Sequence, residues 1–188
     1  MRTEKILVIG GSAGSFRIIT GILETLRPGF PYPVIICIHR LRNVRSGFLE
    51  TFSLKTALPL SEPFDKEPIK KGNCYLAPAN YHLLIENDRH FSLSQFKPVI
   101  FSRPSINLLF DSAADVYGPD AIGVLLSGAN TDGADGIAAI HRAGGMTIVQ
   151  DPSDAEVKTM PESALSLFRP DHVMDAAKIT TFIRNLHS

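Results

Sequence analysis

The sequence lacks an excess of charge of either sign. Its 188 residues contain 19 lysines and arginines and 19 aspartates and glutamates, so the formal net charge at pH 7 is zero. The totals therefore give no indication of a basic surface for nucleic acid or anionic lipid. Three arginines, Arg40, Arg42 and Arg45, do lie close together. They are interpreted either as part of a solvated loop or as a contact surface for an acidic partner.

Cysteine is scarce, and its spacing excludes several classes of protein. The two cysteines, Cys37 and Cys74, are far apart in the chain and form no C-x-x-C pair. This pattern predicts neither a metal site nor a disulfide framework. Each lies in an apolar run, so both are expected to be inert buried thiols of a protein in a reducing compartment.

Long hydrophobic runs are also missing. No apolar stretch approaches the length that a membrane span needs, and the run at residues 6–9 is too short for the core of a signal peptide. No linker rich in proline, glycine and serine divides the chain. We therefore expect a single domain over residues 1–188 of a cytoplasmic protein that is not embedded in a membrane.

What the chain does contain is a regular alternation of short β-branched runs with helical patterns. This alternation predicts an α/β fold, a doubly wound and mostly parallel sheet with helices on both faces. Two alternating runs around a turn at residues 87–89 add a small β-hairpin insertion, at 82–86 and 90–93. Strands are expected at 5–9, 33–39, 58–63, 74–77, 121–126, 147–150 and 172–174, and helices at 15–26, 46–56, from Pro104 onward, 134–143, 162–168 and 176–186.

The stretch Gly10-Gly11-Ser12-Ala13-Gly14 follows the first predicted strand directly. It matches the pattern G-x-S-x-G, in which a strand turns sharply into a helix and exposes a serine at the bend. Glycine permits the strained turn, and the free N–H groups of the new helix point at whatever the serine attacks. Ser12 is therefore a candidate nucleophile, although a tight β-to-α turn without catalytic function gives the same pattern.

Two further polar residues follow predicted strands. His39 ends the second strand, and Asp132 lies in a glycine-bounded loop after the strand at 121–126. Ligands bind at the carboxyl ends of strands in open parallel sheets, so these residues and Ser12 are expected at one edge. In a Ser-His-Asp triad, His39 would be the base and Asp132 would orient it. Taken one at a time, His39 is interpreted as a structural residue and Asp132 as a turn residue or helix cap.

Several ordered motifs together resemble the CheB family of chemotaxis methylesterases, over nearly the whole length of its catalytic domain. The motifs lie at residues 8–15, 34–39, 71–78, 81–83, 103–110, 121–128, 131–133, 143–145 and 160–161. The resemblance implies a serine esterase that removes methyl esters from glutamate side chains of chemoreceptors, and related enzymes also deamidate glutamines. It implies no metal and no organic cofactor.

The resemblance also assigns roles to individual residues. By motif position, Ser12 is the nucleophile, His39 the general base and Asp132 the residue that orients His39. Backbone N–H groups near Ala13 and Ala129 would hold the oxyanion. Because the modified region of a chemoreceptor is acidic, Arg40, Arg42, Arg45 and Arg103 are candidate docking residues.

The sequence departs from the family pattern at the rim of this predicted site. The family serine is usually followed by threonine and two glycines, whereas Ala13, Gly14 and Ser15 follow Ser12. Ala129 replaces a usual methionine, and Thr131 replaces an acidic residue. The receiver domain that commonly precedes the family's esterase domain is not expected, because the first strand begins within a few residues of Met1.

Two other functions stay open on the sequence alone. The first is a degenerate CheB-like domain that binds a receptor or signalling partner without catalysis. The second is an α/β module whose glycine-rich turn cradles a phosphate or nucleotide at a helix N-terminus. Against the second, the glycines are out of register with G-x-G-x-x-G, and no Walker lysine follows.

Overall fold

The computed structural model describes residues 4–39 and 47–186. Within these ranges seven strands form one sheet, in the order β3-β4-β2-β1-β7-β8-β9, and every neighbouring pair is parallel. The strands are β1 (Ile6–Gly11), β2 (Val34–Ile38), β3 (Leu60–Ser61), β4 (Cys74–Leu76), β7 (Ala121–Leu125), β8 (Met146–Gln150) and β9 (His172–Met174). Strands β2, β4 and β3 lie on one side of β1, and the later strands β7, β8 and β9 lie on its other side. The predicted doubly wound sheet is therefore confirmed.

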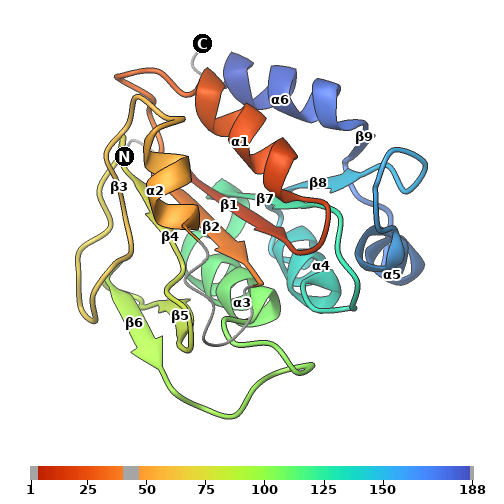
Figure 1. The fold of residues 1–188 in the computed structure, drawn as a ribbon. Coiled ribbons are helices and arrows are strands. Elements are labelled where there is room, and N and C mark those ends of the chain that lie inside the picture. The colour runs from red at the N-terminus through yellow and green to blue at the C-terminus, as the bar shows by residue number, and fades with distance from the viewer. Residues whose placement is uncertain (1–3, 40–46, 187–188) are drawn as a thin grey trace.

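Helices cover both faces of this sheet (Figure 1). Successive residues of β1 explain why, because Ile6 and Val8 point into one apolar cluster while Leu7 and Ile9 point into the other. The helices are α1 (Phe16–Thr25), α2 (Phe48–Ser53), α3 (Ile106–Tyr117), α4 (Ala134–Arg142), α5 (Thr159–Leu167) and α6 (Ala176–Asn185). Helices α1 and α6 lie side by side on one face, and α3 and α4 pack together on the other.

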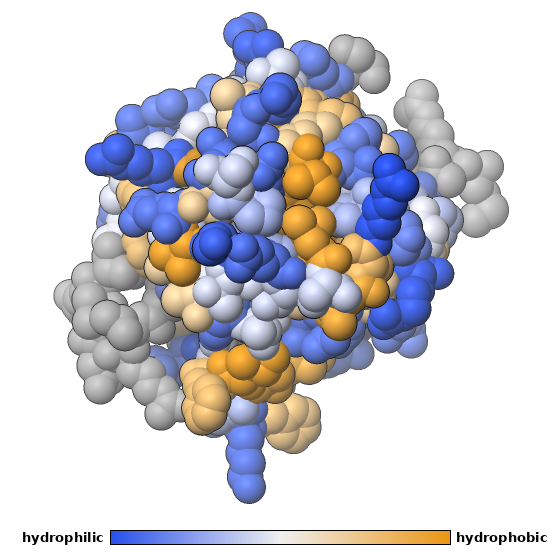
Figure 2. Space-filling model, turned by 90° about the vertical axis from the view of Figure 1, so that its right-hand side faces the viewer, coloured by the Kyte–Doolittle hydropathy of each residue, from blue (hydrophilic) through white to orange (hydrophobic). Residues whose placement is uncertain are grey.

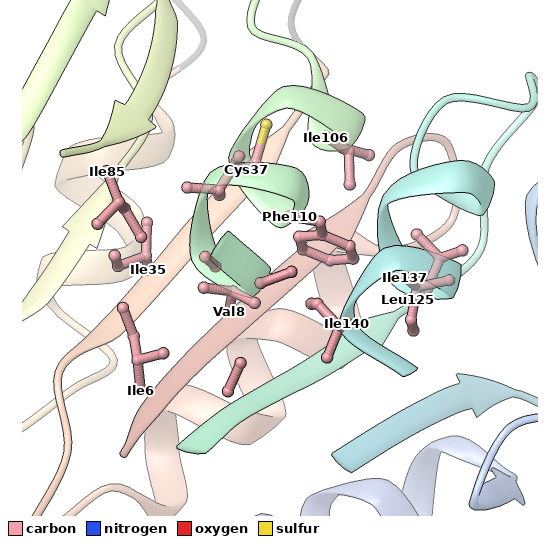
Figure 3. Close-up of a cluster of buried hydrophobic side chains, with 14 of the residues drawn as sticks. Ile6, Val8, Ile35, Cys37, Ile85, Ile106, Phe110, Leu125, Ile137 and Ile140 are labelled. Carbon is pink, nitrogen blue, oxygen red and sulfur yellow. The ribbon is translucent and has the colours of Figure 1, made fainter. Parts of the chain in front are cut away.

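The cluster under α3 and α4 matters most for the site (Figure 3). Phe110 of α3 lies over β1, between Val8 and the isoleucines of α4. A Cβ at Gly10, near the end of β1, would overlap Cγ2 of Ile106 and come within 3.0 Å of the Phe110 ring. Glycine at this position therefore lets the first turn of α3 sit directly on the end of β1.

The predicted hairpin is present, as strands β5 (His82–Ile85) and β6 (Phe91–Ser94), which pair antiparallel. It forms a separate two-stranded sheet and does not extend the main one. Its buried residues Leu83, Ile85 and Phe91 join the apolar cluster beneath α3. The hairpin is therefore held by packing and not by ladder hydrogen bonds to the main sheet.

Some predicted boundaries were wrong. The helix expected from Pro104 begins at Ile106, because the side chain of Ser105 accepts from the N–H of Leu108 and so serves as the N-cap. Helix α5 begins at Thr159 and accommodates Pro161 in its first turn, where no intrahelical N–H is needed. The strand expected at 58–63 is reduced to two residues at the sheet edge.

Both cysteines are buried, as expected. In the ranges that the structure describes, none of the helices has both the length and the apolar character that crossing a bilayer requires.

Candidate active site

The carboxyl ends of β1 and β2 bring two of the predicted site residues together. The parallel register between these strands ends with Gly11 opposite Ile38, so Ser12 and His39 come next on adjacent strands. The backbone N–H of His39 also donates to the carbonyl of Gly11 at 3.2 Å. Both residues keep part of their surface exposed at this edge.

The turn that carries Ser12 is locked to the loop after β7. The N–H of Ser12 donates to the carbonyl of Ser127 at 2.9 Å, and the Ser127 hydroxyl donates to the carbonyl of Ala13 at 2.7 Å. Within the turn, the Ser15 hydroxyl donates to the carbonyl of Ser12 at 2.7 Å. Gly14 has a φ of +82°, a left-handed conformation that favours glycine. The bend at Ser12 is therefore fixed on both sides by hydrogen bonds.

The side chain of Asp132 is fully buried, and its carboxylate accepts hydrogen bonds from groups at the start of α3. Its Oδ1 accepts from the Ser105 hydroxyl at 2.8 Å and from the N–H of Asn107 at 3.0 Å. Its Oδ2 accepts from the N–H of Ile106 at 2.7 Å and lies 2.7 Å from Nε2 of His39. The carboxylate thus sits on the N-terminus of α3, where unpaired N–H groups and the helix dipole favour a negative charge.

Asn107 completes a reciprocal arrangement between α3 and α4. Its side-chain oxygen accepts from the N–H of Gly133 at 2.7 Å and from the N–H of Gly136 at 2.9 Å, both at the start of α4. The Asp132 side chain thus accepts from backbone N–H groups at the start of α3, and the Asn107 side chain accepts from those at the start of α4. The loop that carries Asp132 is therefore fixed at the junction of two helices.

The second ring nitrogen of His39 faces a different group. Its Nδ1 lies 3.4 Å from the hydroxyl of Ser102, a long separation for a hydrogen bond. Ser102 also accepts from the side-chain N–H of Asn130 at 3.1 Å, and the Asn130 carbonyl oxygen accepts from the N–H of Asp132 at 3.1 Å. The side chain of Asn130 therefore bridges Ser102 and Asp132, the two residues that face opposite nitrogens of the His39 ring.

The His39–Asp132 half of the predicted triad is present as a hydrogen bond. Among the described residues, the Ser12 hydroxyl makes no hydrogen bond with either ring nitrogen of His39. Sequence reasoning missed Ser102, Ser105, Asn107 and Asn130. Ser105 and Asn107 could have been suspected, since small polar residues beside a predicted helix start are common capping groups.

The two predicted oxyanion donors lie on the exposed rim. Ala13 and Ala129 are exposed, and in the part of the chain that the structure describes their N–H groups donate to no protein acceptor. The N–H groups just before them are occupied, since Ser12 donates to Ser127 and Gly128 donates to Val157 at 3.0 Å. Two N–H groups are thus left available beside Ser12 on rigid segments.

Comparison with known proteins identifies the family of this chain. The family model of the CheB methylesterase domain matches residues 7–183. The chain belongs to the CheB methylesterase family. A crystal structure of the Thermotoga maritima CheB methylesterase catalytic domain superposes with a TM-score of 0.91 at 30% identity, covering 97% of this chain and 98% of that one.

Relatives of similar sequence carry the corresponding names. A candidate protein-glutamate methylesterase/protein-glutamine glutaminase of Leptospira interrogans is 43% identical over 95% of this chain and 93% of its own length. A protein-glutamate methylesterase/protein-glutamine glutaminase of Geobacter metallireducens is 34% identical over 97% of this chain. The chain spans 53% of the Geobacter protein, about half its length.

Three of the departures from the family pattern lie on the surface of the site, and the fourth, Ser15, is one of its supports. Ala13, Ala129 and Thr131 are exposed, whereas Ser15 is buried and braces the turn through its hydroxyl.

The candidate docking arginines divide into two groups. Arg40, Arg42 and Arg45 lie outside the described residues. A terminal nitrogen of Arg103 donates to the carbonyls of Gln95 and Phe96, at 3.0 and 3.1 Å. This guanidinium therefore braces its own loop, so its expected docking role is at most partial.

No candidate metal site accompanies these residues. Within residues 4–39 and 47–186, no three histidine, cysteine, aspartate or glutamate side chains are arranged to hold a metal ion.

Proposed function

We propose that this chain is a serine esterase that hydrolyses glutamyl methyl esters of chemoreceptors or related sensory proteins, and deamidates glutamine at the same site. The observation that carries the proposal is the hydrogen bond between His39 and Asp132, beside the turn that holds Ser12. Membership of the CheB methylesterase family and the names of the relatives support it.

In the proposed reaction, Nδ1 of His39 acts as the base. A carboxylate only accepts hydrogen bonds, so Nε2, which lies 2.7 Å from Asp132, carries the ring hydrogen. Nδ1 then has the free lone pair that can take the proton of Ser12. Hydrogen bonds between nucleophile and base are often long in free enzymes and tighten when substrate binds.

The reaction has two halves. In the first, Oγ of Ser12 attacks the ester carbonyl carbon while its proton passes to Nδ1 of His39. The bond to the methoxy group then breaks, His39 returns the proton, and methanol leaves while the glutamyl group stays esterified to Ser12. In the second half, water loses a proton to His39 and its oxygen attacks the same carbon. The bond from that carbon to Oγ of Ser12 then breaks, and His39 returns the proton to Oγ, which releases the glutamate and restores Ser12.

The tetrahedral intermediates place a negative charge on the former carbonyl oxygen. The free N–H groups of Ala13 and Ala129 are the proposed donors to this oxyanion. Each such donor contributes about 3 kcal/mol of transition-state stabilisation in other hydrolases. Deamidation follows the same steps, with ammonia in place of methanol.

The nucleotide-binding alternative is disfavoured by the packing of the glycine-rich turn. A Cβ at Gly14 would come within 2.6 Å of the Ser127 hydroxyl and 2.7 Å of Cβ of Glu156. The turn is thus covered by protein side chains, one of which carries a carboxylate. A phosphate at this turn would meet both a steric and an electrostatic barrier.

Methanol release from a methylated receptor fragment tests the proposal. Ser12→Ala removes the nucleophile and should abolish release, while Ser166→Ala, a substitution of an exposed serine on α5, should leave the rate unchanged. Covalent labelling of Ser12 by a fluorophosphonate distinguishes an esterase from a degenerate binding domain. Equal methanol release by the wild type and Ser12→Ala would overturn the proposal.

A further inference from the structure

The loop between β6 and α3 contains a two-residue turn of unusual composition. Val99 and Ser102 pair through both backbone groups, with N···O distances of 3.1 and 2.8 Å, and Ile100 and Phe101 form the turn between them. Both turn residues have positive φ, +46° and +62°. Turns of this geometry favour asparagine and glycine, and a β-branched or aromatic residue is strained there. The residue choice therefore works against the stability of the turn.

The strained turn presents an aromatic ring to solvent. The side chain of Phe101 is 100% exposed, and Phe96 in the same loop is 76% exposed. Figure 2 shows apolar residues gathered at the lower end of the molecule, where Figure 1 has this loop. Single exposed apolar residues are ordinary, but two phenylalanines on one braced loop form a surface suited to a partner.

The base of this turn belongs to the candidate active site. Ser102 is buried, and its hydroxyl lies 3.4 Å from Nδ1 of His39. Arg103 ties the start of the loop to its end through the carbonyls of Gln95 and Phe96. Phe101 is therefore one residue away from a group that faces the base, and it cannot move far without disturbing that contact.

We propose that Phe101, together with Phe96, is the docking element for the protein substrate. The occupant is the protein that carries the glutamyl ester, and an apolar surface next to its modified glutamate would contact the Phe101 ring. This surface is continuous with the candidate active site through Ser102, and it keeps backbone strain at an exposed position. The inference rests on the proposed function and names how that site selects a protein over a small ester.

Binding and reactivity can be separated experimentally. In a Ser12→Ala background, the affinity for a methylated helical receptor fragment is measured with and without Phe101→Ala. Val173→Ala is the control, since Val173 is an exposed apolar residue on β9, at the sheet edge beyond β7 and β8. With Ser12 present, the rate of labelling by a small fluorophosphonate reports reactivity without a docked protein.

Phe101→Ala is expected to raise the Kd for the receptor fragment about tenfold, and Val173→Ala to change it less than twofold. Fluorophosphonate labelling should fall far less than the affinity. Phe101→Gly should weaken binding by a similar factor. Because glycine adopts the positive φ of this position readily, misfolding of the turn would not explain that weaker binding.

An unchanged Kd, a parallel loss of labelling, or no binding of the fragment by the Ser12→Ala protein would overturn the inference. So would conversion of a dimer of this chain into monomers by Phe101→Ala, because the surface would then serve self-association. Failure of the proposed function is distinguishable, since it would leave the wild type without methanol release whatever the Kd values are.

Discussion

Nε2 of His39 lies 2.7 Å from Oδ2 of Asp132, although 93 positions separate the two residues in the chain. The carboxylate is itself held by the first turn of α3, so the imidazole is oriented by a rigid support. Orientation that exists before substrate binds costs no reorganisation during the reaction. This relationship leads to the first two predictions.

The first prediction concerns the tautomer of His39. At a pH where the ring is neutral, the hydrogen should reside on Nε2, because Asp132 can only accept. Long-range ¹H–¹⁵N correlation spectra distinguish the two tautomers directly, and His39→Gln identifies the signal. A ring hydrogen on Nδ1 would contradict the assignment of that nitrogen as the base.

The second prediction is a large loss of activity on Asp132→Asn. An amide can donate to Nε2 and so favour the wrong tautomer, and the equivalent change in a serine protease lowers kcat about 10⁴-fold. Stability should fall as well, by roughly 2–4 kcal/mol, because the amide cannot satisfy all four donors. Methanol release and urea unfolding check the two effects. Activity within tenfold of the wild type would contradict the proposed role of Asp132.

The third prediction concerns the junction of α3 and α4. Asn107→Ala leaves the N–H groups of Gly133 and Gly136 without their acceptor, at a cost of about 1–3 kcal/mol for each buried donor. Urea unfolding should show the loss. Asn107→Asp keeps an acceptor oxygen and should recover part of it. A stability equal to that of the wild type would show that water replaces the side chain.

The fourth prediction is that the turn at Ile100 and Phe101 lowers stability. Replacing the pair by Asn-Gly supplies residues that adopt positive φ readily, so the free energy of unfolding should rise by about 1–2 kcal/mol. Thermal and urea unfolding measure the change, with Val173→Ala as a surface control. A decrease in stability would mean that the side chains are held by contacts that offset the strain.

The fifth prediction is a pH dependence of stability from Cys74. Burial raises the pKa of its thiol from 9.0 to about 12. Below pH 9.0 the thiol is neutral in both states, and its contribution is complete. As the pH rises above 9.0, the unfolded chain loses this proton first, so the contribution declines until pH is about 12.

The comparison of wild type with Cys74→Ala isolates this effect from other titrating groups. Between pH 9 and pH 10 the stability difference should narrow by up to about 1.4 kcal/mol, the value of one pKa unit. Urea unfolding at several pH values gives the difference. A constant difference between pH 8 and pH 10.5 would contradict a raised pKa for Cys74.

Sequence patterns predicted the sheet because its strands are short and almost wholly apolar. The alternation along β1 sends Ile6 and Val8 to one face and Leu7 and Ile9 to the other, which requires helices on both sides. The same reasoning located Ser12 and His39, since each directly follows such a strand. Helix boundaries were less predictable. Pro104 is favoured in the first turn of a helix, but the side chain of Ser105 caps α3, so the helix begins only at Ile106.

The supports of the site could not be predicted in the same way. Ser102 and Asn130 are ordinary polar residues in loops, and nothing local distinguishes them from solvated neighbours. The contacts of Ser102 with His39 and Asn130, and of Asn107 with Gly133, join residues more than 20 positions apart. These contacts exist only once α3 and α4 are packed on β1. The turn at Ile100 and Phe101 contains neither glycine nor asparagine, the residues that predict such a turn.

The sequence by itself determined the fold class and the residues that gather at one edge of the sheet, because apolar periodicity and strand ends are local properties of the chain. Only the tertiary structure decided which nitrogen of His39 faces Asp132, how Asp132 is held, and that Phe101 is exposed next to Ser102, whose hydroxyl faces the other nitrogen. These depend on the relative position of β1, β2 and α3. That position follows from packing of side chains far apart in the sequence, with Ile106 fitted over Gly10 as the contact that brings α3 to the end of β1.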